Sequence, residues 1–166
     1  MRCFTPDHSP NDKGEVFMEI WKNIWRKGIA PLLSSSSLVA LQRALEESDP
    51  HLAQGCVVFP RPVPSCWDLP PLALGFFAYC GMEGEGLFSI FEVSDFHDRM
   101  ILAVDEHLDE PGACQEFLNW FDSTERKVIC ERLLPEIRWE LSQRHEKAVL
   151  VSQSMKQTPF SYEYHS

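Results

Sequence analysis

The stretch that decides the fold is Ser89–Leu108, with the sequence SIFEVSDFHDRMILAVDEHL. Ser89 and Glu92 have the spacing of a capping box, which satisfies backbone N–H groups at the start of a helix. At 100° per residue, the apolar positions and one histidine fall within an arc of about 100°, the width of a core-facing stripe. These positions are Ile90, Val93, His97, Met100, Ile101, Val104 and Leu108. The pattern predicts one helix over residues 90–108.

The opposite side of this predicted helix is acidic. The segment Glu83–Glu110 holds nine acidic residues against the single base Arg99, so it carries −8 of the chain's net charge of −10. Solvated helix faces normally mix both signs of charge, which limits self-repulsion. We therefore expect this face to dock a basic protein partner, and a plain solvated face is the alternative. The candidate partner-binding residues are Glu92, Asp95, Asp98, Asp105, Glu106 and Asp109.

Helical spacing also marks the N-terminal part of the chain. Apolar residues from Val16 to Trp25 predict a first helix that stops at Gly28. Its tryptophans alternate with basic residues, but two tryptophans four residues apart more often anchor a core than a partner. The serine run Ser34–Ser37 offers N-caps for a second helix, which we expect to end before Asp49.

The middle of the chain mixes strand, proline and helix signals. Cys56–Phe59 suits a short strand, and the five prolines that follow within Phe59–Pro71 require extended or irregular backbone. We predict a third helix that is capped by Asp68 and runs through Phe77. The glycine-rich stretch Gly81–Gly86 matches no phosphate-binding motif and indicates a turn with positive φ.

The C-terminal part is predicted to add two more helices. A short aromatic helix around Phe117–Phe121 follows Pro111, and a last helix has its apolar positions between Val128 and Leu141. Pro135 should kink or split that last helix, because proline removes a backbone donor and clashes with the preceding turn. A weak strand over Ala148–Val151 would close the domain.

Together these patterns predict a mainly α fold, a single-domain irregular bundle of about five or six helices that leaves room for a minor short β-hairpin. A length of 166 residues suits one domain with one core. The predicted organisation is a flexible N-terminal tail over residues 1–14, a single helical domain over 15–151 and a flexible C-terminal tail over 152–166.

Composition argues against several functional classes. An acidic chain lacks the clustered lysine and arginine that bind phosphates, so we expect no nucleic-acid binding. No apolar run approaches the roughly 18 residues of a membrane span, and the N-terminus lacks a secretory signal, so we expect a cytoplasmic protein. No motif for a cofactor or for catalysis stands out, which favours a non-enzymatic protein without a cofactor and leaves its oligomeric state open.

An alternative of a different class is a small-ligand, metal-binding or catalytic domain with a pocket lined by cysteine and histidine. Its candidate lining residues are Cys66, Trp67, Cys80, His97 and Cys114. The six cysteines show no C-x-x-C pair, which favours reduced, buried thiols. The simpler interpretation of His97 is a core histidine hydrogen-bonded to backbone.

Overall fold

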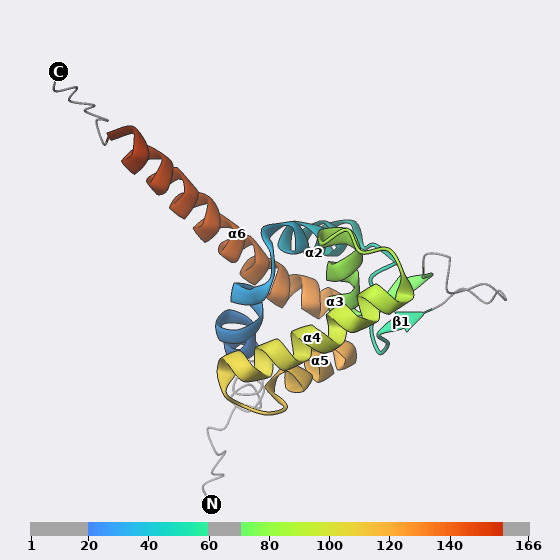
Figure 1. The fold of residues 1–166 in the computed structure, drawn as a ribbon. Coiled ribbons are helices and arrows are strands. Elements are labelled where there is room, and N and C mark those ends of the chain that lie inside the picture. The colour runs from blue at the N-terminus through green and yellow to red at the C-terminus, as the bar shows by residue number, and fades with distance from the viewer. Residues whose placement is uncertain (1–19, 60–70, 158–166) are drawn as a thin grey trace, which may run out of the picture.

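The computed structural model describes residues 20–59 and 71–157, which form a helical domain from which one long helix projects (Figure 1). In chain order the elements are η1 (Trp25–Ile29), η2 (Ala30–Leu32), α2 (Ser35–Glu47), β1 (Val58–Phe59), β2 (Ala73–Leu74), α3 (Phe76–Tyr79), η4 (Cys80–Gly84), α4 (Ile90–Leu108), α5 (Ala113–Ser123) and α6 (Arg126–Gln157). The predicted fold class, a mainly α domain with a minor antiparallel pair of strands, is confirmed.

The first helix continues past the predicted stop at Gly28. Residues 20–24 are α-helical, η1 is a turn of π-helix that includes Gly28, and η2 is a 3-10 turn that ends at Leu32. Gly28 serves a close approach, since a Cβ there would lie 2.6 Å from Cδ1 of Leu108 in α4. Pro31 lies in the first turn of η2, where a missing N–H costs nothing. The predicted stop was wrong because this glycine allows close packing against α4 and does not end the helix.

The capping predictions for α2 and α4 are confirmed. The Ser34 hydroxyl accepts a hydrogen bond from the Ser37 N–H at 3.1 Å, and α2 ends at Glu47. At α4 the Ser89 hydroxyl accepts from the Glu92 N–H, and the Glu92 carboxylate accepts from the Ser89 N–H, which is the predicted capping box.

The predicted third helix begins later than expected. Leu74 lies in β2, where its N–H donates to His51 O and its carbonyl accepts from Ala53 N–H, both at 2.7 Å. The strands β1 and β2 are antiparallel, with Val58 paired to Leu74. Helix α3 begins only at Phe76, and the proposed cap Asp68 lies outside the described residues. Periodicity alone could not separate strand from helix in this apolar run.

The glycine-rich stretch is mostly helical rather than a turn. Residues Cys80–Gly84 continue α3 as the π-helical element η4, and of the three glycines only Gly86 has a positive φ, at 75°. Gly84 is instead required by space, because a Cβ there would lie 2.5 Å from the Cα of Ser37 in α2. This contact holds η4 directly against the start of α2.

The core is built around stacked and edge-packed aromatic rings. Phe76 contacts Phe117 and Phe121 with ring centroids 5.1 and 5.0 Å apart, and Trp21 stacks on Trp120 at 3.9 Å. Trp21 and Trp25 are buried, with exposed fractions of 2% and 1%. The two tryptophans are therefore core anchors, as predicted, and not a contact surface.

Helix α6 differs most from expectation. It runs unbroken from Arg126 to Gln157, so Pro135 does not split it and the predicted strand Ala148–Val151 is wrong. Buried residues such as Leu133 and Ile137 hold its first half in the core. A helix that is already nucleated adds further residues at little cost, which carries α6 across the predicted domain limit at residue 151.

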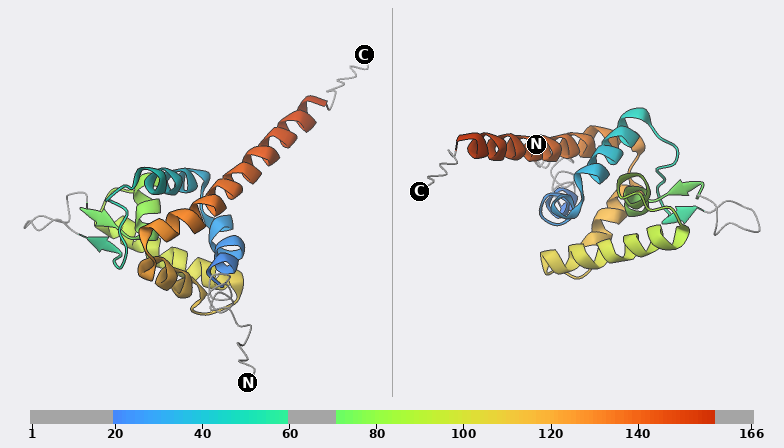
Figure 2. Two further views of the ribbon diagram at one scale, coloured as in Figure 1. Left: turned by 180° about the vertical axis from the view of Figure 1, so that it is seen from behind. Right: turned by 45° about the horizontal axis from the view of Figure 1, so that its top comes forward.

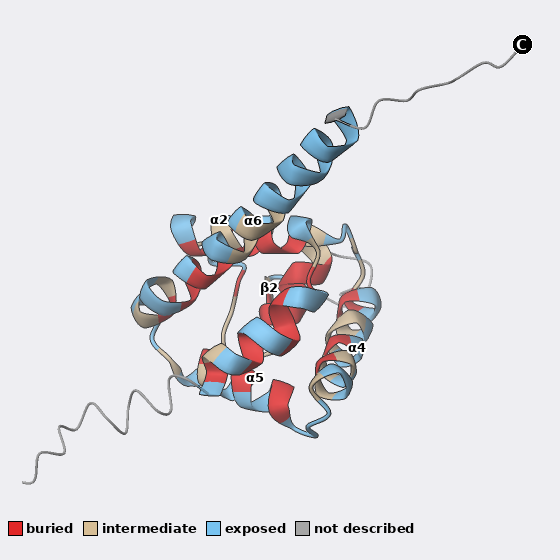
Figure 3. Ribbon diagram, turned by 90° about the vertical axis from the view of Figure 1, so that its left-hand side faces the viewer, coloured by how far each residue is buried: buried red, intermediate tan, exposed pale blue. Residues whose placement is uncertain are grey.

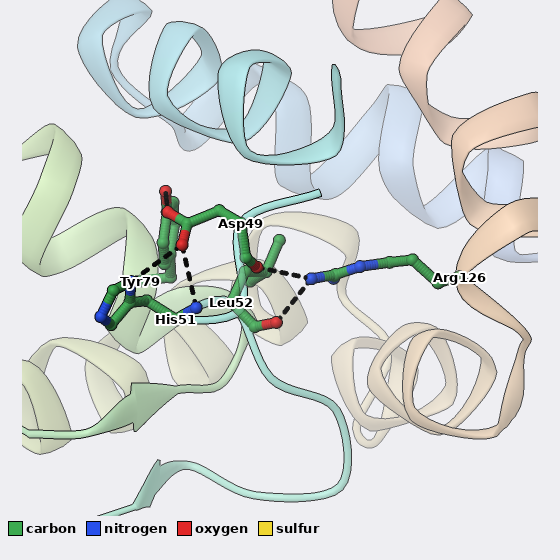
Figure 4. Close-up of polar contacts among 5 residues, drawn as sticks. All are labelled: Asp49, His51, Leu52, Tyr79 and Arg126. Atoms are coloured by element: carbon green, nitrogen blue, oxygen red, sulfur yellow. Dashed lines mark hydrogen bonds and ion pairs between the residues drawn. The ribbon is translucent and has the colours of Figure 1, made fainter. Parts of the chain in front are cut away.

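Polar ties hold the ends of these elements together. The Asp49 carboxylate accepts hydrogen bonds from the Tyr79 hydroxyl at 2.7 Å and from the His51 N–H at 2.9 Å (Figure 4). Arg126, at the start of α6, donates to the carbonyls of Asp49 and Leu52 at 2.9 and 2.7 Å. The chain after α2 is thereby fastened to both α3 and α6.

A second tie joins the first helix to α6. The carboxylate of Glu136, only 7% exposed, accepts two hydrogen bonds from the Arg26 guanidinium at 2.7 and 2.8 Å. Lys22 lies 3.8 Å from the same carboxylate. Two of the basic residues next to the tryptophans of the first helix, Lys22 and Arg26, thus have a structural use.

Candidate functional site

The acidic face of α4 lies on the outside of the domain. Val93 and Val104 on its inner side have no exposed surface, and the six predicted acids lie on the opposite side. Five of these acids are exposed and Asp105 is half-buried. The helix therefore turns its apolar side inward as predicted, and five of the six acids lie in solvent.

Three of the six acids have partners within the domain. Glu92 belongs to the capping box, and Asp95 forms an ion pair with Arg99 at 2.8 Å. Asp105 accepts hydrogen bonds from the N–H groups of Gly112 at 3.0 Å and Cys114 at 2.8 Å, so it caps the start of α5. The Asp105 carboxylate is therefore occupied by hydrogen bonds within the fold and is not free to bind a partner protein.

The remaining three acids, together with one apolar side chain, form a compact surface. Asp98, Glu106 and Asp109 are exposed, and within the described parts of the chain they form no ion pair. Leu102 lies between them and is 68% exposed. At 100° per residue these four side chains fall within about 80° of one another. We call Asp98, Leu102, Glu106 and Asp109 the α4 face.

The structure describes three of the five residues proposed for the alternative pocket, namely Cys80, His97 and Cys114. Cys66 and Trp67 lie outside the described residues, and Cys80 and Cys114 have no exposed surface. Burial raises the pKa of the Cys114 thiol to about 12, with the nearby Asp105 carboxylate adding to the rise, and burial likewise raises the pKa of Cys80. These thiols are protonated packing residues. The described cysteines are unpaired, in accord with the predicted reduced state.

His97 does face a small pocket, but with other neighbours. The pocket has a volume of about 300 Å³, and its polar lining residues include Cys56, His97, Gln115 and Asp122. The Nδ1 atom of His97 is buried and has no hydrogen-bond partner among the described residues, so none of their backbone groups bonds to this atom. Within the described ranges no group of three histidine, cysteine or acidic residues is placed to hold a metal ion.

Burial lowers the pKa of His97, and the carboxylates of Asp98 and Asp122 partly oppose that effect. The ring is therefore neutral near pH 7, and its edge packs against Phe77 with centroids 6.0 Å apart. Burial also raises the pKa of Cys56, and the Asp122 carboxylate adds to the rise, so the Cys56 thiol is not activated.

The second half of α6 was not predicted from the sequence. Every residue from His145 to Lys156 is exposed, and the views of Figure 2 show this part of α6 leaving the domain. A strand and a tail were predicted there. The available signal was the apolar spacing of Leu141, Ala148, Val151 and Met155, which is helical.

Comparisons with protein-family models, with curated proteins and with solved structures gave no match. Separately, none of the helices in residues 20–59 and 71–157 combines the length and the apolarity needed to cross a membrane.

Proposed function

We propose that this chain is a non-enzymatic interaction module whose α4 face binds a basic segment of a partner protein. The observation that carries the proposal is the combination of an exposed Leu102 with three carboxylates that have no cationic partner among the described residues. An apolar anchor surrounded by charge is a common form of recognition surface, in which the charges give specificity and speed of association.

The rest of the domain supports this proposal by holding the helix rigid. Met100 and Val104 pack α4 into the core, and its two ends are fixed by the capping box and by the Asp105 cap. A partner would meet a surface that is already formed, which lowers the entropy cost of binding. A cytoplasmic location and the absence of nucleic-acid binding stay predictions from the sequence.

The test is a charge reversal with a matched control. In one variant Asp98, Glu106 and Asp109 are replaced by Lys; in the control, the exposed acids Glu47, Glu116 and Glu131 are replaced by Lys. Both variants undergo the same change in net charge.

Each immobilised protein is exposed to a cell lysate, captured proteins are identified, and their binding is remeasured with purified material. We expect the first variant to lose the partner and the control to keep it. Wild-type binding should weaken as salt rises from about 0.05 to about 0.5 M, because screening shortens the range of charge interactions. Equal binding by the two variants would contradict the proposal.

A small-ligand site at His97 is the second candidate function. The observation in its favour is that His97 lines a pocket of about 300 Å³ and that its Nδ1 atom has no hydrogen-bond partner among the described residues. Ligand-observed NMR with a library of small polar compounds, repeated on His97→Phe, tests it. Compounds that bind the wild type and not the variant would support this function. If no compound distinguishes the two proteins, this function is contradicted.

A further inference from the structure

The second half of α6 presents the same helix face that its first half buries. Ile129, Leu133 and Ile137 on this face are fully buried, and Leu141 packs at the edge of the core. Beyond the domain the face continues with Ala148, Val151 and Met155 at spacings of seven, three and four residues. Figure 3 shows the change from buried to exposed along the helix. An apolar face thus extends into solvent without a covering element from the described chain.

The charges beside this face have one sign. A shallow hollow on the helix is lined by Lys147, Ala148, Val151, Ser152, Met155 and Lys156. At 100° per residue, Lys147 and Lys156 lie on opposite sides of the apolar face, whereas Glu146 points to the far side of the helix. Val151 and Met155 are 58% and 71% exposed. We call Lys147, Ala148, Val151, Met155 and Lys156 the α6 face.

This pattern disfavours antiparallel pairing of two α6 helices with each other. In an antiparallel pair each edge of the interface meets the same edge of the other helix, so lysines would approach lysines. The complementary surface is an exposed helix with an apolar centre and acids on both sides. The α4 face meets that description, with Leu102 at its centre and Asp98, Glu106 and Asp109 around it.

The two faces also match in length. At 1.5 Å per residue, Lys147 and Lys156 are separated by about 14 Å along α6, and Asp98 and Asp109 by about 16 Å along α4. Within one chain the two faces do not meet, because the second half of α6 points away from the domain that contains α4 (Figures 1 and 2).

We infer that the α6 face of one copy docks on the α4 face of a second copy of this chain. The inference rests on the proposed function, since it names the basic segment that the α4 face binds. The contact joins two different surfaces, so each copy keeps one face of each kind and assemblies can grow beyond a dimer into rings or open chains. A contact of three or four helical turns is smaller than the roughly 1,200 Å² of a stable interface, which predicts weak, concentration-dependent association.

Sedimentation velocity with complementary charge reversals tests the inference. One variant carries Lys147→Glu and Lys156→Glu, so both of its faces are acidic; the other carries Asp98→Lys and Glu106→Lys, so both are basic. We expect the wild type to associate at about 0.5 mM and to dissociate in about 0.5 M salt. Each variant alone should be monomeric, and an equimolar mixture of the two should associate again.

Two substitutions of exposed apolar residues distinguish the contact between the α6 and α4 faces from a general effect on α6. Val151→Glu lies on the α6 face and should abolish association, whereas Leu150→Glu lies off that face at a similar exposed fraction, 64% against 58%, and should not. Circular dichroism and thermal unfolding confirm that every variant is folded.

Three results would overturn the inference. The first is a wild type that stays monomeric at about 0.5 mM in low salt. The second is continued association of the Asp98→Lys, Glu106→Lys variant, which would point to α6 pairing with itself. The third is a mixture of variants that stays monomeric. If salt-sensitive capture of another protein by the α4 face persisted in any of these cases, the proposed function would stand without self-association.

Discussion

At the scale of single residues, Asp49 links the end of α2 to α3 through its carboxylate. Burial by itself would raise the pKa of Asp49, but hydrogen bonds from the His51 N–H, the Tyr79 hydroxyl and the His51 ring outweigh it and lower that pKa below its ordinary value. A folded-state pKa below the unfolded one means that the folded protein binds fewer protons. The stability from this site is therefore present above about pH 4 and is lost as the pH falls through the folded-state pKa.

We predict that Asp49→Asn lowers the free energy of unfolding by about 1 kcal/mol at pH 7 and by less at pH 3, because hydrogen bonds to a carboxylate exceed those to an amide. Urea unfolding between these two pH values measures the effect. Tyr79→Phe removes one donor and should give a smaller loss with the same pH trend. An Asn variant whose loss is equal at both pH values would contradict this account of Asp49.

His97 gives a second prediction for a single residue, and here too stability is lost as the pH falls. Because burial depresses its pKa, stability is present above the unfolded value near 6.5 and is lost as the pH falls through the folded-state pKa. His97→Phe removes this proton linkage and the unpartnered Nδ1 atom, and it keeps a ring against Phe77.

The stability advantage of the variant over the wild type should therefore be larger at about pH 5 than at about pH 8. Thermal or urea unfolding at the two pH values measures the difference. An advantage that is no larger at the lower pH would show that His97 does not titrate with folding.

At the scale of elements, the contact between η4 and α2 depends on a glycine for space rather than for its backbone angle. We predict that Gly84→Ala costs about 2–4 kcal/mol, because the new Cβ would overlap the backbone of Ser37 and one of the two elements would have to move.

Gly86→Ala is the matched control two residues away. Its Cβ would meet nothing within 4 Å, but its φ is 75°, so only the left-handed strain of about 1 kcal/mol applies. Denaturant unfolding compares the two variants. Equal losses would mean that η4 and α2 are not as closely packed as described.

The contact between α4 and α5 makes the six acids of α4 unequal. Asp105 accepts hydrogen bonds from two N–H groups at the start of α5, whereas Asp98, seven residues earlier, and Glu106, the next residue, face solvent. Charge reversal at Asp105 would damage the fold and confuse a binding test, and for that reason it is left out of the variants proposed above.

At the scale of the whole molecule, α6 joins two environments in one helix. Its first half is held by core contacts and by the Glu136 and Arg126 ties, and Arg144 still donates to the carbonyl of Ala30. Residues 145–156 that follow are all exposed. An isolated helix of about 12–15 residues is marginal in water. The two halves should therefore differ sharply in stability.

We predict that amides over residues 145–157 exchange with solvent far faster than those over 129–141 in dilute protein. Hydrogen exchange followed by mass spectrometry measures this difference directly. Raising the protein concentration should protect the second half if the inferred association occurs. Equal protection of both halves in dilute protein would show that some other contact holds the second half of α6.

Periodicity and capping, which are local properties, could be predicted from the sequence. The apolar stripe and capping box of α4, the Ser34 cap of α2 and the burial of Trp21 and Trp25 all depend on residues within a few positions of one another. For the same reason the sequence alone determined that Glu92, Asp95, Asp98, Glu106 and Asp109 lie on the exposed side of α4, whereas the half-burial of Asp105 depends on α5.

Contacts between distant segments were decided only by the tertiary structure. Leu74 became a strand residue because backbone groups near residues 51–58 were there to pair with it, and Gly28 lies within a helix because α4 packs against it. The second half of α6 is exposed because no other described element reaches it. A local pattern specifies which side of a helix is apolar, but whether that side is covered depends on where the rest of the chain lies, and that is why the α6 face emerged only from the structure.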